Sequence, residues 1–190
     1  LGRYLSAMTT GAGGSARILS PSLIGAIVGQ YSLPWRGTHG LPHWGRVLEN
    51  GLRIGEEEGA DLEVVALFSV FHDSRRENEG WDHGHGRRGA DLAARMRGEI
   101  YELDEARFDL LYYACAHHTD GLRDGDSTVR TCWDADRLDL GRVHITPDPK
   151  FLATEYAARP EVISWAEERS RGGHVPPVTL EWEAWAKARE

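Results

Sequence analysis

Apolar residues recur at helical spacing along most of the chain, and polar or glycine-containing segments separate these stretches. An apolar residue every three or four positions is the pattern of an amphipathic helix. It predicts helices opening at Ser20-Pro21 and then over 42–58, 61–71, 86–97, 104–118, 127–139, 159–170 and 179–189. The alternation typical of strands is weak throughout. The pattern therefore predicts a single all-α domain, a helical bundle.

The helix predicted at 61–71 differs from the others because it is apolar around most of its circumference. Asp61 is placed to cap its first turn, and valine, leucine and phenylalanine dominate from Val64 to Phe71. A helix with so little polar surface is expected to be buried in the centre of a bundle. The polar doublet His72-Asp73 follows it directly, which packing alone does not require.

Three segments carry turn signals, and one terminal segment has no apolar pattern. Residues 74–84 and 119–126 read as loops, and Pro147 and Pro149 break the chain within 144–150. Residues 1–19 are rich in Gly, Ser and Thr and are expected to form a mobile leader. Because the chain starts with leucine, we expect Met8 to be the natural start, behind a vector remnant.

Composition and charge narrow the classes of partner. The formal net charge is −8, which argues against broad nucleic-acid binding but not against a small phosphorylated substrate. Cys115 and Cys132 are the only cysteines and make no disulfide framework, so a cytoplasmic protein is expected. No run of apolar residues is long enough to span a bilayer, so no membrane partner is expected.

Residues of the types that bind transition metals recur in the order H…HD…H…HH…D. They are His43, His72, Asp73, His85, His117, His118 and Asp136. Each alone has an ordinary explanation, such as a core histidine, a helix-terminal charge or a surface ion pair. Together they are better explained by a shared site, because imidazole and carboxylate groups bind transition metals and the set exceeds the four ligands of a structural zinc site. The sequence therefore predicts a two-metal site with a bridging carboxylate.

The order and local contexts of these residues resemble the HD-domain superfamily of metal-dependent phosphohydrolases. His43, in a His-Trp-Gly-Arg-Val segment, is similar to the family's first histidine, and His72-Asp73 is similar to the doublet that names the family. Asp136, in Asp-Ala-Asp-Arg-Leu-Asp, is similar to its final aspartate. The resemblance covers roughly residues 40–142, and it implies one HD domain with C-terminal helices over 20–190.

Two further elements are similar to particular branches of that superfamily. The segment His-Gly-Arg-Arg-Gly-Ala from His85 resembles the H-x-x-x-G-A element of the HD-GYP cyclic-dinucleotide phosphodiesterases, and His117-His118 resembles their HH element. The layout is also similar to that of CRISPR-associated HD nuclease domains. Where HD-GYP proteins carry Gly-Tyr-Pro after the HH element, this chain has Leu-Arg-Asp from Leu122. This departure argues against a cyclic di-GMP substrate.

The resemblance implies specific roles for these residues. One ion would take His43, His72, Asp73 and Asp136, and the other would take Asp73, His85, His117 and His118. A hydroxide bridging the two ions would attack phosphorus, with Asp73 and Arg76 as catalytic residues. Candidate substrate-binding residues are Arg75, Arg88 and His83, and Asp82 or His83 could orient a ligand histidine. The ligand types suit Fe, Mn, Zn, Ni or Co.

Three functions are compatible with such a site. The first is a phosphodiesterase or nucleotidase acting on a small phosphorylated substrate, for example a nucleotide. The second is an HD-type mixed-valent diiron oxygenase, whose order H…HD…H…H…D takes one histidine of the 117–118 pair. The third is a non-catalytic sensor that binds a nucleotide or metal. Retention of every ligand-type residue favours the enzymes over the sensor.

Tryptophans near the predicted ligands are candidates for stacking on a base. They are Trp35, Trp44, Trp81 and Trp133, although tryptophan more often belongs to the core. The C-terminal helix carries Trp182 and Trp185, which are expected either to pack on the core or to form a homodimer contact.

Overall fold

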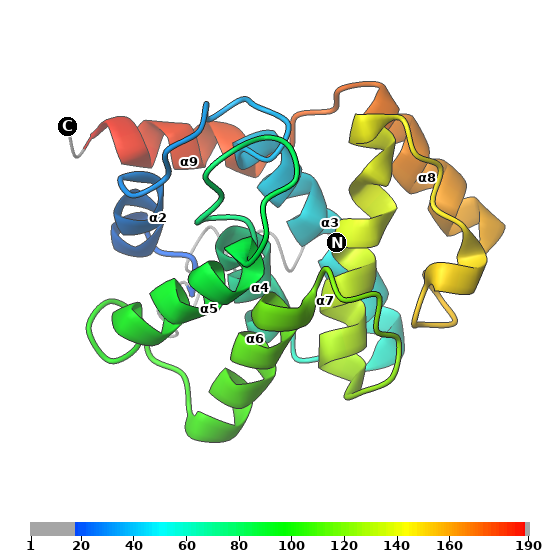
Figure 1. Cartoon of the computed structure of the whole chain (residues 1–190), viewed down its shortest axis with the longest axis horizontal. Coiled ribbons are helices and arrows are strands. Elements are labelled where there is room, and N and C mark those ends of the chain that lie inside the picture. The colour runs from blue at the N-terminus through cyan, green and yellow to red at the C-terminus, as the bar shows by residue number, and fades with distance from the viewer. Residues whose placement is uncertain (1–17, 189–190) are drawn as a thin grey trace.

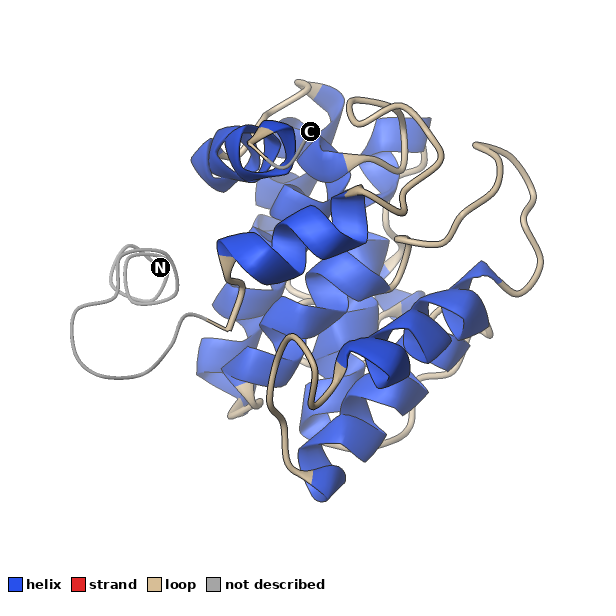
Figure 2. Cartoon of the chain, turned by 90° about the vertical axis from the view of Figure 1, so that its left-hand side faces the viewer, coloured by secondary structure: helices blue, strands red, loops and turns tan. Residues whose placement is uncertain are grey.

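A computed structural model of the chain describes residues 18–188 and shows a bundle of α-helices (Figures 1 and 2). The helices are α2 (Pro21–Val28), α3 (Leu41–Glu58), α4 (Leu62–Phe71), α5 (His85–Met96), α6 (Glu105–His117), α7 (Ser127–Arg137), α8 (Pro160–Arg171) and α9 (Pro177–Lys187), with the 3₁₀ helices η1 (Leu138–Val143) and η2 (Pro149–Phe151). No strand is present between residues 18 and 188, where a single isolated bridge joins Arg97 to Tyr101. The predicted all-α single-domain bundle is confirmed.

The predicted leader, residues 1–19, lies outside the described residues except for its last two. Of these two, Leu19 is buried in the hydrophobic core. None of the helices within residues 18–188 combines the length and the apolar character that crossing a bilayer requires.

Helix α4 is the centre of the bundle, as its composition predicts. All residues from Val64 to Phe71 are buried, and the helix packs against α2, α3, α5, α6 and α7. Figure 1 shows α4 behind α5 in the middle of the molecule. Asp61 caps its first turn by accepting hydrogen bonds from the amides of Glu63 and Val64. Because other helices enclose α4, the residues that follow its last turn lie in the interior of the bundle.

The C-terminal helix α9 packs on the core, against α2 and α3. Its Trp182 is fully buried, and its Glu183 accepts a hydrogen bond from Arg36 at 2.8 Å. Trp44 and Trp133 are fully buried as well, as expected of core tryptophans. A homodimer contact through α9 stays a prediction.

Most helix boundaries differ from the predicted ones by one or two residues, and two of these differences affect the site. His85 is the first residue of α5 rather than part of the preceding loop, because Gly84 adopts a left-handed conformation (φ 79°) that starts the helix early. Helix α7 ends at Arg137 and continues as the 3₁₀ helix η1. The tighter turn of η1 directs Asp139 towards α3, where it contacts His43.

Glycines allow α5 to approach its neighbours closely. A Cβ atom at Gly89 would lie 2.3 Å from the carbonyl oxygen of Phe71, and one at Gly86 would lie 2.4 Å from the carbonyl oxygen of Cys115. Both distances are far below van der Waals contact, so only glycine fits at either position. The close approach brings the start of α5 to the C-terminal ends of α4 and α6, where His72 and His118 lie.

Candidate metal centre

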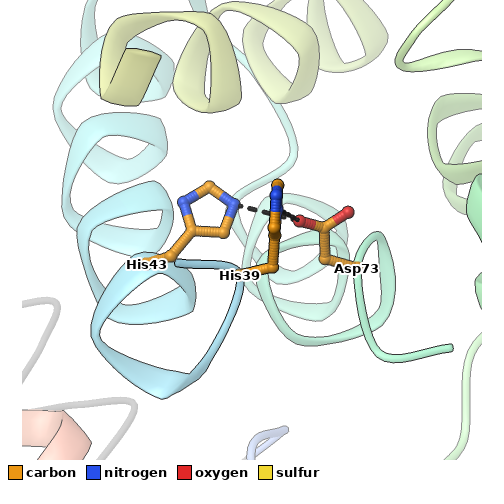
Figure 3. A group of neighbouring side chains, drawn as sticks. All are labelled: His39, His43 and Asp73. Atoms are coloured by element: carbon orange, nitrogen blue, oxygen red, sulfur yellow. Dashed lines mark hydrogen bonds and ion pairs between the residues drawn. The ribbon is translucent and has the colours of Figure 1, made fainter. Parts of the chain in front are cut away.

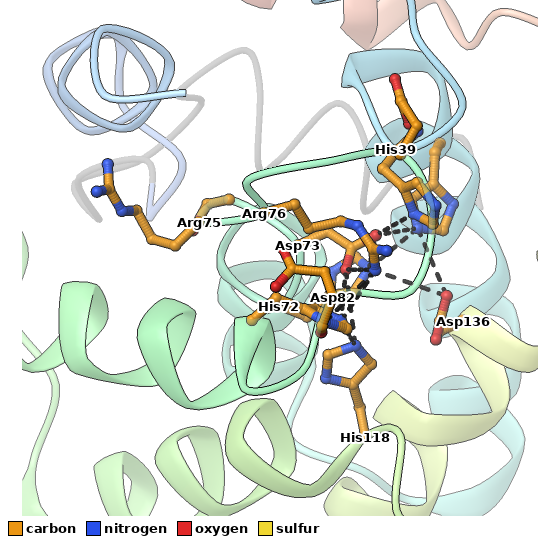
Figure 4. Close-up of polar contacts among 12 residues, drawn as sticks. His39, His72, Asp73, Arg75, Arg76, Asp82, His118 and Asp136 are labelled. Carbon is orange, nitrogen blue, oxygen red and sulfur yellow. Dashed lines mark hydrogen bonds and ion pairs between the residues drawn. The ribbon is translucent and has the colours of Figure 1, made fainter. Parts of the chain in front are cut away.

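Buried histidines and aspartates from several helix ends converge at one place (Figure 4). They form three overlapping groups, namely His39, His43 and Asp73; His43, His72 and Asp136; and Asp73, His85 and His118. Within each group the possible ligand atoms lie within 4.8 Å of one another. Groups of this composition could hold a metal ion.

The first histidine pair, His43 and His72, places two ring nitrogens face to face. The Nε2 atoms are 3.0 Å apart. Nδ1 of His43 lies 2.7 Å from Oδ2 of Asp139, and Nδ1 of His72 lies 3.1 Å from the carbonyl oxygen of Phe68. Since these oxygens can only accept, both Nδ1 atoms carry a proton, so when both rings are neutral the two Nε2 atoms present lone pairs to each other. Such a pair repels unless a cation lies between its members.

Burial keeps His72 neutral. Its ring is fully covered, and this desolvation lowers its pKa to about 3, although the charges of Asp73 and Asp136 act in the opposite direction. His72 is therefore a poor site for a proton near neutral pH. A metal ion, which binds the neutral imidazole, fits it better.

The second pair, His85 and His118, repeats this arrangement. Its Nε2 atoms are also 3.0 Å apart. Nδ1 of His85 lies 2.7 Å from the carbonyl oxygen of Asp82, and Nδ1 of His118 lies 2.8 Å from that of Cys115. Burial lowers the pKa of His118, but its interaction with Asp73 and the charge of Asp136 outweigh burial and raise the pKa above its usual value. The second pair is thus an environment that favours positive charge.

Asp73 lies between the two pairs and turns one oxygen to each. Its Oδ2 lies 3.4 Å from Nε2 of His43. Its Oδ1 lies 3.1 Å from Nε2 of His85 and 3.7 Å from Nε2 of His118. Burial raises the pKa of this carboxyl, but the surrounding histidines outweigh burial and hold the pKa well below its usual range. Asp73 is therefore an ionised carboxylate with one oxygen facing each histidine pair.

Asp136 completes the group around the first pair. Its Oδ1 lies 3.5 Å from Nε2 of His43 and 3.9 Å from Nε2 of His72. This oxygen is buried and has no hydrogen-bond partner among residues 18–188. Nη2 of Arg142 lies 3.8 Å away, beyond hydrogen-bond distance, and a buried carboxylate oxygen without a hydrogen bond is costly unless a cation balances it more closely. The orphaned oxygen and the facing lone pairs all fit a metal ion at one point.

A carboxylate outside this set orients His43. Asp139 accepts from Nδ1 of His43 and is itself held by Arg46, whose Nε and Nη2 atoms donate to it at 2.6 and 3.0 Å. Partners of this kind fix the tautomer and direction of a ligand histidine. The sequence motif around Asp136 included Asp139 but did not reveal its role, because the turn into η1 directs it.

His39 was not predicted and lies inside the cluster. Its Nδ1 lies 2.7 Å from Oδ2 of Asp73 (Figure 3). The residue precedes α3, and its position is fixed because its carbonyl oxygen accepts from the indole of Trp44 and its amide donates to Glu79. The spacing to His43, four residues, was the available signal. The intervening Gly40 and Pro42 obscured it, because they mark a helix start rather than a continuous helical face.

Arg76 brings a positive charge to the second pair. Its Nη1 lies 3.1 Å from Nε2 of His85 and 3.5 Å from Oδ1 of Asp73. Its Nη2 donates to the carbonyl oxygen of Gly80 at 2.6 Å. The side chain therefore connects the cluster to the loop that contains Gly80.

Other predicted residues are not brought into the cluster. Arg75 points away from it in Figure 4 and donates to the carbonyl oxygen of Gln30 at 2.6 Å. Arg88 is paired with Asp82 at 2.7 Å, and His83 is exposed beside Trp81. Arg75, Arg88 and His83 make contacts in or beside the 75–84 loop, and none of them belongs to the groups of candidate ligands.

His117 is also outside these groups. Its Nδ1 bonds to Oδ2 of Asp120 at 2.7 Å, its ring packs on Tyr113, and 37% of its side chain is exposed. Its neighbour His118 is buried and faces inward. The structure therefore separates the two members of the HH element.

This separation predicts different outcomes for two adjacent alanine substitutions. His118→Ala is expected to weaken metal binding by more than the roughly 10- to 100-fold that loss of an outer partner costs. His117→Ala, the matched control, is expected to leave metal content unchanged. Elemental analysis of both purified variants measures the difference. Equal loss of metal in the two would contradict the assignment of His118 alone.

A cavity of about 400 Å³ opens beside the second pair. Arg76 and His85 belong to its lining, together with the loop residues 80–84 and Thr119 and Asp120 after α6. Its volume lies within the usual range for small-molecule sites. A ligand in this cavity would therefore meet the cluster at the Arg76 and His85 end.

Comparisons with protein-family models, with curated proteins and with solved structures found no match for this chain. The chain is an all-α bundle that carries buried His and Asp groups able to hold a metal ion.

Proposed function

We propose that the chain is a metal-dependent phosphohydrolase of the HD type, a phosphodiesterase or nucleotidase that acts on a small phosphorylated substrate. The observation that carries the proposal is the pair of facing Nε2 contacts, each 3.0 Å, with one oxygen of Asp73 turned to each. This arrangement suits two ions that share a carboxylate. The adjoining cavity supplies room for a substrate.

Two of the three groups of candidate ligands would each hold one ion, namely His43, His72 and Asp136, and Asp73, His85 and His118. Asp73 would also reach the first ion through Oδ2, which lies 3.4 Å from Nε2 of His43 and accepts from His39. His117 is absent from the second group. When bound, such ions supply an activated water and neutralise phosphate charge.

The chain's own residues then have separate tasks. The Asp73 carboxylate keeps both groups at a fixed spacing, and Asp139 holds His43 in the tautomer that turns Nε2 inward. Arg76, at the junction of cluster and cavity, is suited to hold phosphate oxygens, because guanidinium geometry matches them in a bidentate way. A bound phosphate would draw its Nη1 away from His85.

Hydrolysis of a panel of phosphate esters in the presence of Mn²⁺ tests the proposal, measured as release of inorganic phosphate from monoesters and as release of the alcohol from diesters. We expect release that stops on chelation and returns when metal is restored. Arg76→Met is expected to lower the rate roughly 100-fold, as for loss of one donor to developing charge. Arg75→Ala, the matched control, should leave the rate unchanged because Arg75 points away. A fully metal-loaded protein that hydrolyses none of these esters would contradict the proposal.

One observation favours a second candidate, a mixed-valent diiron oxygenase. Only one histidine of the 117–118 pair lies in the cluster, which leaves the order H…HD…H…H…D. The resemblance links that order to the oxygenases of the same superfamily. An oxygenase would be purified with iron and would show an O₂-dependent change in its visible spectrum, whereas a hydrolase would release phosphate without consuming O₂.

A further inference from the structure

We propose that Trp81 is a stacking platform that makes the cavity selective for phosphate esters carrying a planar aromatic ring, such as a nucleobase. The inference rests on the proposed function for the position of the phosphate. It adds the part of the substrate that lies away from the cluster and a residue that recognises it.

The first observation is the exposure of Trp81 at the cavity. The residue lines the 400 Å³ cavity, yet 85% of it is exposed, the largest fraction among the exposed large hydrophobic residues between 18 and 188. Trp44, Trp133 and Trp182, by contrast, are fully buried. Exposure of a whole indole to water is unfavourable, and a flat ligand that covers it regains that free energy.

The second observation is that the ring is held in place although little covers it. The indole Nε1–H donates to Nε2 of His83, and the two rings meet edge to face, with centroids 5.3 Å apart and an angle of 81° between planes. The contact uses the edge of the indole and leaves a face available for stacking. A ring fixed in this way loses less conformational entropy when a ligand binds.

The segment that carries Trp81 is itself anchored. Arg88 donates to the Asp82 carboxylate at 2.7 and 2.8 Å and to the carbonyl oxygen of His83 at 3.0 Å. Arg76 donates to the carbonyl oxygen of Gly80. The residues on both sides of Trp81 are therefore held by arginines that are buried or half-buried. This anchors the backbone that carries the exposed ring.

The third observation is the polarity of the cavity between Trp81 and the cluster. Arg76 and His85 line one end, where a phosphate would bind, and Thr119 and Asp120 supply hydroxyl and carboxylate groups along the wall. Thr119 and Asp120 are both exposed and Asp120 already accepts from Nδ1 of His117, so this wall is hydrated and suits a polar sugar better than an aliphatic chain. A base joined to phosphate by a sugar offers a flat face for Trp81 and donors for Asp120.

Binding of non-hydrolysable ligands to the metal-loaded full chain tests the inference without relying on turnover. The probes are the 5′-methylenephosphonate analogue of adenosine monophosphate and the matching phosphonate of ribose, which lacks the base. Calorimetry is expected to show about tenfold tighter binding of the adenosine compound, in line with stacking of one base on an aromatic side chain. Trp81→Ala should abolish that preference, and Trp81→Phe should keep part of it.

Phe151→Ala is the control, because Phe151 is 60% exposed and does not line this cavity. It should retain the full preference. Equal affinity of the wild-type chain for the two phosphonates would overturn the inference, as would an unchanged preference in Trp81→Ala. Base-dependent binding without hydrolysis of any phosphate ester would refute the proposed function and leave the stacking role intact. Phosphate release without base preference would do the reverse.

Discussion

Replacing Asp73 with alanine is expected to remove bound metal from both histidine pairs and to abolish metal-dependent phosphate release. The reason is the position of the carboxylate, which turns one oxygen to His43 and the other to His85. No other carboxylate between residues 18 and 188 is shared by the candidate metal groups on both sides. The loss of activity should exceed the roughly 10- to 100-fold typical of an outer-shell partner.

Elemental analysis of metal per chain measures this effect directly. Asp73→Asn should lose almost as much bound metal as Asp73→Ala, because a carboxamide keeps the shape of the side chain but loses the charge and one acceptor oxygen. Asp109→Ala, an exposed aspartate on α6, is the control and should keep its full metal content. Circular dichroism separates loss of metal from loss of fold. Wild-type metal content in folded Asp73→Ala would show that the site lies elsewhere.

Gly89→Ala is expected to destabilise the protein, which is the opposite of what helix propensity predicts. Within a helix, alanine is normally better than glycine by about 1 kcal/mol. Here the new Cβ would lie 2.3 Å from the carbonyl oxygen of Phe71 and 3.1 Å from that of His72. Both atoms are backbone and cannot rotate away. We expect a loss of about 1–3 kcal/mol, the usual cost of overpacking.

The same substitution should also weaken metal binding at the candidate metal centre. Pushing α5 away from the end of α4 would separate His85 from Asp73, so we expect lower metal content along with a melting temperature that falls roughly 2–4 °C per kcal/mol. Gly80→Ala is the control, because its Cβ would meet only the Asn78 side chain at 3.4 Å. A Gly89→Ala variant as stable as the wild type would mean that α5 and α4 do not pack this closely.

The helices were largely predictable because their signals are local. Asp61 caps α4 where its spacing indicated, and the apolar run behind it is the buried centre. The ends of the helices were harder to predict from the sequence. Gly84 starts α5 early through a left-handed turn, and the passage from α7 into η1 depends on packing rather than on any residue type.

The candidate site was predictable to the extent that residue type decided membership. His72, Asp73 and Asp136 lie together as their order suggested. Which member of the 117–118 pair turns inward was not predictable, because adjacent helical residues point about 100° apart and the packing of α5 selects between them. His39 was not predicted as a member of the cluster because it lies in the segment before α3, which has no helical periodicity.

Diffraction from crystals grown with Mn²⁺, with anomalous data collected to locate the metal, tests the central claim most directly. We expect one anomalous peak among Nε2 of His43, Nε2 of His72 and Oδ1 of Asp136, and a second between His85 and His118 beside Asp73. Absence of any peak at these side chains in metal-replete crystals would contradict the account of this cluster as a metal centre.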